Sequence, residues 1–234
     1  MIAERRERTV LETISHLPAS GFVLIGGYAV NAYVPPRFSG DCDLVVLSGM
    51  TAIEELLLRN QFVRKEEGEA PYGVGTYLRY WKEEEKAGFD LLQGSVLDNR
   101  TGILFESALF EKYSAERVTN GKMDVRIIKL RVVDPELLFA MKFVPVRRAD
   151  VRDMFMLSGK DLNWDLVIEH ITNKCGRVII EASLDRIKSI VEATGYRDDI
   201  NSTFGRIPNN RYDLCQRRLN EFLSRLKNGL TRSS

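Results

Sequence analysis

The chain has 234 residues, of which 44% are hydrophobic and 29% are charged, and its formal net charge is +1. This is the composition of a soluble globular protein that is long enough to bury a core without disulfides, arranged as one large domain or two small ones. A net charge near zero gives no sign of a nucleic-acid binder, although a local basic patch is compatible with it.

The three cysteines give no sign of a disulfide framework or a zinc site. Cys42, Cys175 and Cys215 lie far apart and show no CxxC spacing, which favours reduced thiols in a cytoplasm. The N-terminal segment MIAERRERTVLETI is charged and lacks the apolar core of a signal peptide, and no apolar run approaches the ~20 residues that span a bilayer. We therefore expect a cytoplasmic protein without a membrane segment.

The first ~130 residues mix predicted helices and strands. Apolar residues recur at helical or alternating spacing, and Pro18, the Gly26-Gly27 pair and Pro35-Pro36 mark where elements end. The predicted helices cover 4–17, 28–33 and 51–59, and the predicted strands cover 22–25, 44–47, 61–64, 76–82 and 89–92. Further strands at 117–118 and 123–130 flank Asn120-Gly121, a pair typical of a tight hairpin turn.

From Asp134 onward the pattern is helical only. Asp134 precedes Pro135, as an N-cap residue precedes proline at the first helical position. The predicted helices cover 135–145, 148–158, 163–172, 177–193 and 212–227. The sequence thus predicts an α+β fold, with a mixed α/β domain over residues 1–133 and an all-helical domain over 134–234.

Three aspartates stand out because apolar strand residues surround them. Asp41 and Asp43 are two residues apart at the start of a strand, so their side chains share a face, and Asp90 lies within the apolar stretch FDLLQ. If these strands are neighbours, three carboxylates converge, and a divalent cation would relieve their repulsion. Carboxylates suit magnesium, so we expect Asp41, Asp43 and Asp90 to form a site for Mg²⁺ or Mn²⁺.

A glycine pair adds a second half to this site. Gly26 and Gly27 lie between a predicted strand and a predicted helix, where the backbone can approach a ligand closely and the first helical N–H groups can bind an anion. Phosphate on this loop beside metal-binding carboxylates is the layout of a nucleotide-transfer site.

Each feature also has a purely structural explanation. A glycine pair after a strand is often only a turn, a DxD pair is often a solvated loop or a helix cap, and an aspartate such as Asp90 is often an edge residue. The combination of order, spacing and context is more specific than any of its parts.

The two motifs together resemble a known superfamily. GGYAVNAY followed by RFSGDCDLVV resembles the nucleotidyltransferases that include DNA polymerase beta, minimal nucleotidyltransferases and aminoglycoside nucleotidyltransferases. The stretch with Arg37, Ser39, Asp41 and Asp43 is most similar to the branch that contains the abortive-infection-type nucleotidyltransferase toxins. Members carry a Gly-Gly or Gly-Ser loop, a following DxD pair and a third carboxylate on a later strand.

A second segment resembles the same branch. Members commonly have a helix with an inward lysine, then an arginine, then a basic residue followed by aspartate, and Lys142, Arg148, Arg152 and Asp153 match this pattern. The sequence departs from it at Met156, where the pattern has a final aspartate, and the interval between the lysine and the arginine is about one residue short.

The resemblance implies a role for each matching residue. Gly26 and Gly27 would hold the triphosphate of an NTP such as ATP, and Ser39 would touch phosphate. Asp41, Asp43 and Asp90 would bind the metal ions, Asp90 would also receive the proton from the attacking hydroxyl, and Lys142 would neutralise the departing pyrophosphate.

The leading hypothesis is therefore a metal-dependent nucleotidyltransferase that transfers NMP to a hydroxyl acceptor and releases pyrophosphate. The toxin-like branch suggests a tRNA or protein acceptor and an antitoxin partner, whereas the antibiotic-modifying branch suggests a small molecule. The alternatives are a nucleotide-binding or antitoxin-like module that has this fold and little catalysis, and a purely structural domain. The oligomeric state and the nucleotide preference are not encoded in any motif.

Overall fold

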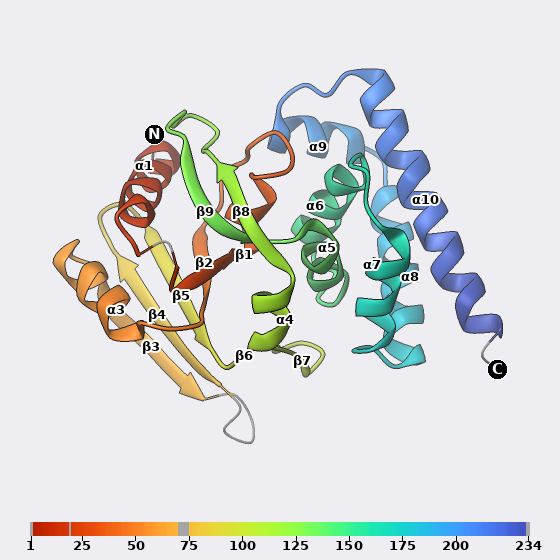
Figure 1. The fold of residues 1–234 in the computed structure, drawn as a ribbon. Helices are drawn as coiled ribbons and strands as arrows, with labels where there is room; N and C mark the ends of the chain where they lie inside the picture. The colour runs from red at the N-terminus through yellow and green to blue at the C-terminus, as the bar shows by residue number, and fades with distance from the viewer. Residues whose placement is uncertain (1, 19, 70–74, 233–234) are drawn as a thin grey trace. The chain divides into compact units, whose positions relative to one another are not determined.

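The computed structural model describes residues 2–18, 20–69 and 75–232 of the chain (Figure 1). The chain divides into two compact units, which we describe separately. The first unit comprises Met1–Leu97 and Leu104–Asp134, and the second comprises Asp98–Ile103 and Pro135–Ser234. The division into a catalytic domain over residues 1–133 and a helical domain over residues 134–234 stays a prediction.

The first unit contains a mixed seven-stranded sheet in the order β3-β4-β5-β2-β1-β9-β8. Strands β2 and β5 run parallel, as do β1 and β9, and the other neighbouring pairs are antiparallel. The strands are β1 (Phe22–Ile25), β2 (Asp41–Val46), β3 (Val63–Glu69), β4 (Thr76–Lys82), β5 (Ala87–Gln93), β8 (Ser114–Thr119) and β9 (Ile128–Val133). This sheet, together with the helices of the second unit, confirms the predicted α+β class.

The helices of the first unit are α1 (Ile2–Ser15), α2 (Gly26–Val30), α3 (Met50–Arg59) and α4 (Ser107–Lys112). One face of the central strands is apolar and lies under α1 and α3. Cys42 and Phe89 on this face are fully buried, and Tyr80 donates a hydrogen bond to Glu54 of α3. Because side chains alternate along a strand, the residues on either side of Cys42 face the opposite way.

Two features of the first unit differ from the prediction. A small sheet of β6 (Ser95–Asp98) and β7 (Ile103–Glu106), as well as α4, has no counterpart among the predicted elements. The tight hairpin turn predicted at Asn120-Gly121 is wrong, because strand pairing ends at Thr119 and Ile128 and leaves a longer connection. In that connection the carboxylate of Glu7 accepts backbone hydrogen bonds from Lys122, Met123 and Asp124.

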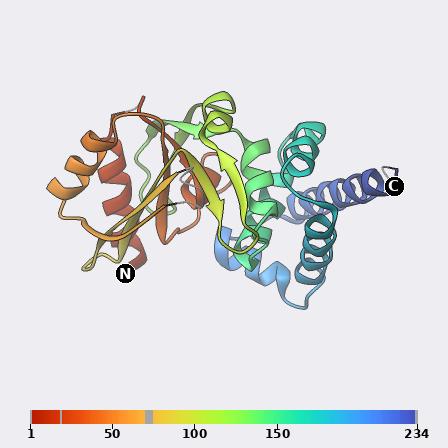
Figure 2. The same cartoon turned by 90° about the horizontal axis from the view of Figure 1, so that it is seen from below.

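Apart from Asp98–Ile103, the described part of the second unit consists of helices (Figure 2). They are α5 (Pro135–Phe143), α6 (Arg148–Ser158), α7 (Trp164–Thr172), α8 (Arg177–Val191), α9 (Tyr196–Phe204) and α10 (Asn209–Arg232). Phe139 of α5 and Phe222 of α10 pack edge to face, and Trp164 of α7 lies against both rings. Helix α9 was not predicted, because its segment YRDDINSTF has few apolar positions.

The longest described helix is α10. It is amphipathic, with a polar face toward solvent and an apolar face toward the other helices of its unit. Its inner face buries Cys215, Leu219, Phe222 and Leu226 at intervals of three or four residues. Within the described ranges, no helix combines the length and apolar character that crossing a membrane requires.

Candidate active site

The three predicted aspartates lie on neighbouring strands of the first unit. Asp43 of β2 is directly opposite Asp90 of β5, and Asp90 is directly opposite Arg79 of β4. In the adjacent row, Asp41 is opposite Gly88, which is opposite Trp81. Directly opposed residues share a face of the sheet, so the strand register brings the carboxylates together as the sequence predicted.

The alternation of burial explains why this face is polar. Along β2, Asp41 and Asp43 are partly exposed, whereas Cys42 and Leu44 are buried. Along β5, Asp90 is partly exposed between the buried residues Phe89 and Leu91. The apolar residues fix both strands in the core, and this fixation holds the carboxylates on a rigid support.

Asp43 lies directly against the predicted glycine loop. Ile25, the last residue of β1, is opposite Asp43, and Gly26 follows with a φ of 65°. A Cβ atom added at Gly26 would overlap Oδ2 of Asp43. Glycine is therefore required here both by the left-handed backbone and by the close approach of the carboxylate.

Gly27 makes a similar approach to the segment that precedes β2. A Cβ atom at Gly27 would overlap Oγ of Ser39 and lie 3.1 Å from Nη2 of Arg37. Asn31 fixes this segment, because its side chain accepts a hydrogen bond from the backbone N–H of Arg37 (3.1 Å) and donates one to the Arg37 carbonyl (3.0 Å). A hydroxyl, a guanidinium and a glycine backbone thus lie together, a combination suited to phosphate.

Arg79 lies among the carboxylates and was not singled out in the sequence. Its Nη2 is 3.0 Å from Oδ2 of Asp41, and its Nη1 is 3.8 Å from Oδ2 of Asp90. Its guanidinium also lies over the ring of Trp81, 5.7 Å from the centroid. Tyr77, two residues before Arg79, donates a hydrogen bond of 3.2 Å to Oδ1 of Asp90. The alternation of TYLRYWK was the signal that places Tyr77, Arg79 and Trp81 on one face.

Burial changes the acid–base character of this cluster. Desolvation raises the pKa of Asp90 to about 6, the guanidinium of Arg79 opposes this rise, and the charge of Asp41 adds to it. Desolvation followed by the charge of Asp90 raises the pKa of Tyr77 to about 12. A pKa of about 6 lets Asp90 exchange a proton near neutral pH.

The donor atoms suit a divalent cation, and Arg79 contacts two of the three carboxylates, Asp41 and Asp90. Carboxylate oxygens are hard ligands of the kind that Mg²⁺ and Mn²⁺ prefer, and the sheet brings three carboxylates to one place. As the side chains stand, no group of three or more Asp, Glu, His or Cys residues in the described part of the chain has an arrangement that could hold a metal. The cation that Asp41 and Asp90 contact is the guanidinium of Arg79.

The predicted second segment forms a buried ion cluster within the second unit. Nζ of Lys142 in α5 is 3.1 Å from Oδ1 of Asp150 and 3.1 Å from Oδ2 of Asp153, both in α6. Burial by itself would raise the pKa of Asp150, but Lys142 and Arg147 outweigh it and hold that pKa below its usual range. Lys142 and Asp153 therefore join two helices, and nucleotide binding by Lys142 stays a prediction.

Arg148 and Arg152 make a separate connection in the same unit. Both guanidinium groups extend from α6 to Asp199 of α9, with Nε of Arg148 2.7 Å and Nη1 of Arg152 2.5 Å from its carboxylate oxygens. The four matching residues of the second segment thus link α5, α6 and α9, and their similarity to the toxin branch is compatible with a structural role.

No family model matches the chain, and no curated protein matches it. Among solved structures, a candidate nucleotidyltransferase from H. pylori is 15% identical, with 99% of this chain and 96% of that chain covered and a TM-score of 0.45. The nucleotidyltransferase toxin MenT4 from Mycobacterium tuberculosis H37Rv is 14% identical, with coverage of 95% and 82% and a TM-score of 0.42.

A third structure, a STING-associated CdnE c-di-GMP synthase from Capnocytophaga granulosa, is 8% identical, with coverage of 100% and 83% and a TM-score of 0.25. At these identities and TM-scores the similarity supplies no argument about chemistry, which must come from the residues of the first unit.

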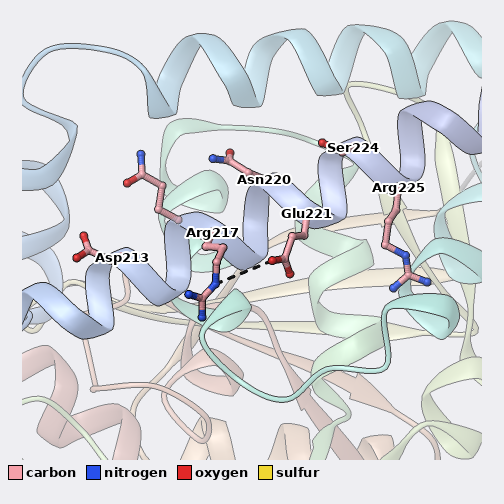
Figure 3. Close-up of a pocket in the computed structure, with 7 residues that line it drawn as sticks. Asp213, Arg217, Asn220, Glu221, Ser224 and Arg225 are labelled. Carbon is pink, nitrogen blue, oxygen red and sulfur yellow. Dashed lines mark ion pairs between the residues drawn. The ribbon is translucent and has the colours of Figure 1, made fainter.

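A groove in the second unit contains none of the predicted site residues (Figure 3). It has a volume of about 870 Å³ and runs along a polar face of α10. Its lining residues are Asp213, Gln216, Arg217, Asn220, Glu221, Ser224 and Arg225. All of them come from one helix, and Arg217 lies 3.9 Å from Glu221 one turn away, so this is a solvated helix surface and not an enclosed site.

Proposed function

We propose that the chain is a nucleotidyltransferase that transfers NMP from an NTP to a hydroxyl group, with a divalent cation bound by Asp41, Asp43 and Asp90. The observation that supports this proposal is the meeting of two halves in one place. The strand register puts Asp43 opposite Asp90, and Gly26 of the phosphate-type loop lies directly against Asp43.

The loop half is suited to the triphosphate. Gly26 and Gly27 allow close approach of phosphate to the backbone, and Ser39 and Arg37 lie beside Gly27 with a hydroxyl and a guanidinium. Asn31 holds the backbone of Arg37 from both sides, which limits the reorganisation needed when phosphate binds.

The carboxylate half is suited to activating the acceptor. In the proposed reaction the acceptor oxygen bonds to the α-phosphorus, the bond from that phosphorus to the bridging oxygen breaks, and pyrophosphate leaves. Asp90 takes the hydroxyl proton, a role to which a pKa of about 6 is well matched. A bound divalent cation supplies positive charge at the phosphate oxygens and makes the hydroxyl more acidic. The strands keep these groups in fixed positions.

A transfer assay tests the proposal. The purified chain is incubated with each of four α-³²P-labelled NTPs, Mg²⁺ or Mn²⁺, and in turn total tRNA, a protein extract and a panel of aminoglycosides. We expect label on one acceptor class and its loss in Asp43→Asn. The exposed Asp185 of α8 provides the control Asp185→Asn, which should transfer label normally. Equal transfer by Asp43→Asn and wild type would refute the proposed site.

One observation favours a second candidate function, a nucleotide-binding module without catalysis. Arg79 already contacts Asp41 and Asp90, and a permanent guanidinium there would hold the carboxylates without metal. Binding of a labelled NTP that needs no divalent cation, together with no transfer to any acceptor class, would favour this module over the enzyme.

A further inference from the structure

We propose that Arg79 is an internal counter-cation that a divalent metal must displace from Asp41, so that Arg79 sets the metal affinity of the site. This inference rests on the proposed metal site and adds to it a residue that controls its occupancy.

The pairing geometry supports competition between the two cations. Arg79 is directly opposite Asp90 in the sheet, and its guanidinium reaches across to Asp41, with Nη2 3.0 Å from Oδ2. The guanidinium therefore occupies one side of Oδ2, where a second cation would meet both its bulk and its positive charge. A metal that binds Asp41 through this side of Oδ2 must displace the guanidinium.

The surroundings of Arg79 hold it in the competing position. Its guanidinium lies over the ring of Trp81, and Gly88 between Trp81 and Asp41 leaves the room for this arrangement. A Cβ atom at Gly88 would lie 2.7 Å from Oδ1 of Asp41 and 3.0 Å from the Trp81 ring. The absence of a side chain at Gly88 thus lets Asp41, Arg79 and Trp81 pack together.

The exposure of the pair makes an exchange of cations feasible. The side chains of Arg79 and Asp41 are 28% and 32% exposed, so water and ions reach them. The backbone of Arg79 is fixed between β3 and β5, so displacement means rotation of the side chain alone. An ion pair at a partly exposed site is weak enough for a divalent ion to compete with the guanidinium for the carboxylate.

The test compares Mn²⁺ binding by wild type, Arg79→Gln and Arg79→Lys, measured without nucleotide by electron paramagnetic resonance of free Mn²⁺. Removing the competing charge should lower the dissociation constant of Arg79→Gln by on the order of tenfold, whereas Arg79→Lys should stay closer to wild type. Arg64→Gln is the matched control, because Arg64 lies in β3 of the same sheet but contacts Glu54 of α3 and Glu67 of β3, so its loss should leave Mn²⁺ affinity unchanged.

Thermal melting in EDTA gives a second readout. We expect Arg79→Gln to melt below wild type in EDTA, because the carboxylates then repel one another, and to gain more from added Mn²⁺ than wild type gains. If the role of Arg79 is purely structural, Arg79→Gln should melt below wild type both in EDTA and with Mn²⁺, and it should not bind Mn²⁺ more tightly.

The outcomes separate this inference from the proposed function. Equal Mn²⁺ affinity of wild type and Arg79→Gln, or weaker binding by the variant, overturns the role of Arg79. If label transfer that depends on Asp43 is found at the same time, the proposed function stands. Absence of Mn²⁺ binding in all variants overturns this inference, and absence of label transfer is a separate result that overturns the proposed function.

Discussion

At the residue scale, Gly26 carries two constraints that no other residue type satisfies. Its φ of 65° is in the left-handed region, and a Cβ atom there would overlap the carboxylate of Asp43. The backbone strain of a side chain in this conformation costs about 1–2 kcal/mol, and displacement of Asp43 adds to it. The glycine thus couples the shape of the loop to the position of an acidic side chain on another strand.

We therefore expect Gly26→Ala to lower the free energy of unfolding by about 2 kcal/mol or more and to abolish label transfer. Urea denaturation in EDTA measures the stability, so that any loss of metal binding does not contribute. Gly229→Ala is the control, since a Cβ atom there meets nothing within 4 Å and alanine favours the helix. Full transfer activity in Gly26→Ala would contradict the close approach of Asp43 to the loop.

The sequence indicated some site residues and not others, for physical reasons. Gly26, Gly27, Asp41 and Asp43 were accessible because one short segment contains them in a fixed order. Arg79 was not, because its role depends on β4 pairing with β5 and on Arg79 standing opposite Asp90 in that pairing. Strand register between segments is a non-local property, and a slip of one residue would turn Arg79 to the other face.

At the element scale, the connection between β8 and β9 shows how a distant side chain overrides a local turn preference. Asn120-Gly121 favours a two-residue turn, yet the Glu7 carboxylate of α1 accepts backbone hydrogen bonds of 2.7–3.0 Å from Lys122, Met123 and Asp124. Glu7 is 1% exposed. Three N–H groups that compensate one buried carboxylate make a wider connection more favourable than a tight hairpin.

This account predicts that Glu7→Gln destabilises the first unit by roughly 1–3 kcal/mol. The amide has no charge and offers one acceptor oxygen, so all three N–H groups lose a charged acceptor and at least one of them faces an NH₂ group instead of an oxygen. Urea denaturation measures the stability, and hydrogen exchange should show faster exchange at the amides of Lys122, Met123 and Asp124. Glu12→Gln on the exposed side of α1 should change neither property. Unchanged exchange at these three amides in Glu7→Gln would argue that Glu7 does not determine the connection.

Most strands and helices could be predicted because their apolar periodicity is strong. The strand predicted at 76–82 matches β4, and the helix at 148–158 matches α6. The predicted strand at 44–47 began too late, because Asp41 and Asp43 are poor strand formers that are held in β2 by pairing with β1 and β5. Helix α9 was missed because its polar segment is fixed by tertiary contacts such as those of Asp199 with Arg148 and Arg152.

At the scale of the whole molecule, the two units carry different kinds of charge pairing. In the second unit, Lys142 is buried with Asp150 and Asp153, so its pairing is satisfied within the bundle. In the first unit, Asp41, Asp43 and Asp90 are partly exposed on one sheet face, where the guanidinium of Arg79 contacts Asp41 and Asp90. A divalent cation would therefore reach these carboxylates more readily than the buried pairs of the second unit.

This difference predicts how ligand affects the stability of the chain. Mg²⁺ with a non-hydrolysable NTP should raise the melting temperature, because a ligand present at about 100 times its dissociation constant stabilises the folded state by about 2.7 kcal/mol. Differential scanning calorimetry with Mg²⁺ alone, NTP alone and both together measures the shift, which should be largest with both. Asp43→Asn should remove the shift, because it takes a metal ligand from the proposed site, whereas Asp185→Asn should keep it. If Mg²⁺ and NTP together at millimolar concentration leave the melting temperature of wild type unchanged, the aspartates are a structural cluster and the nucleotide site is refuted.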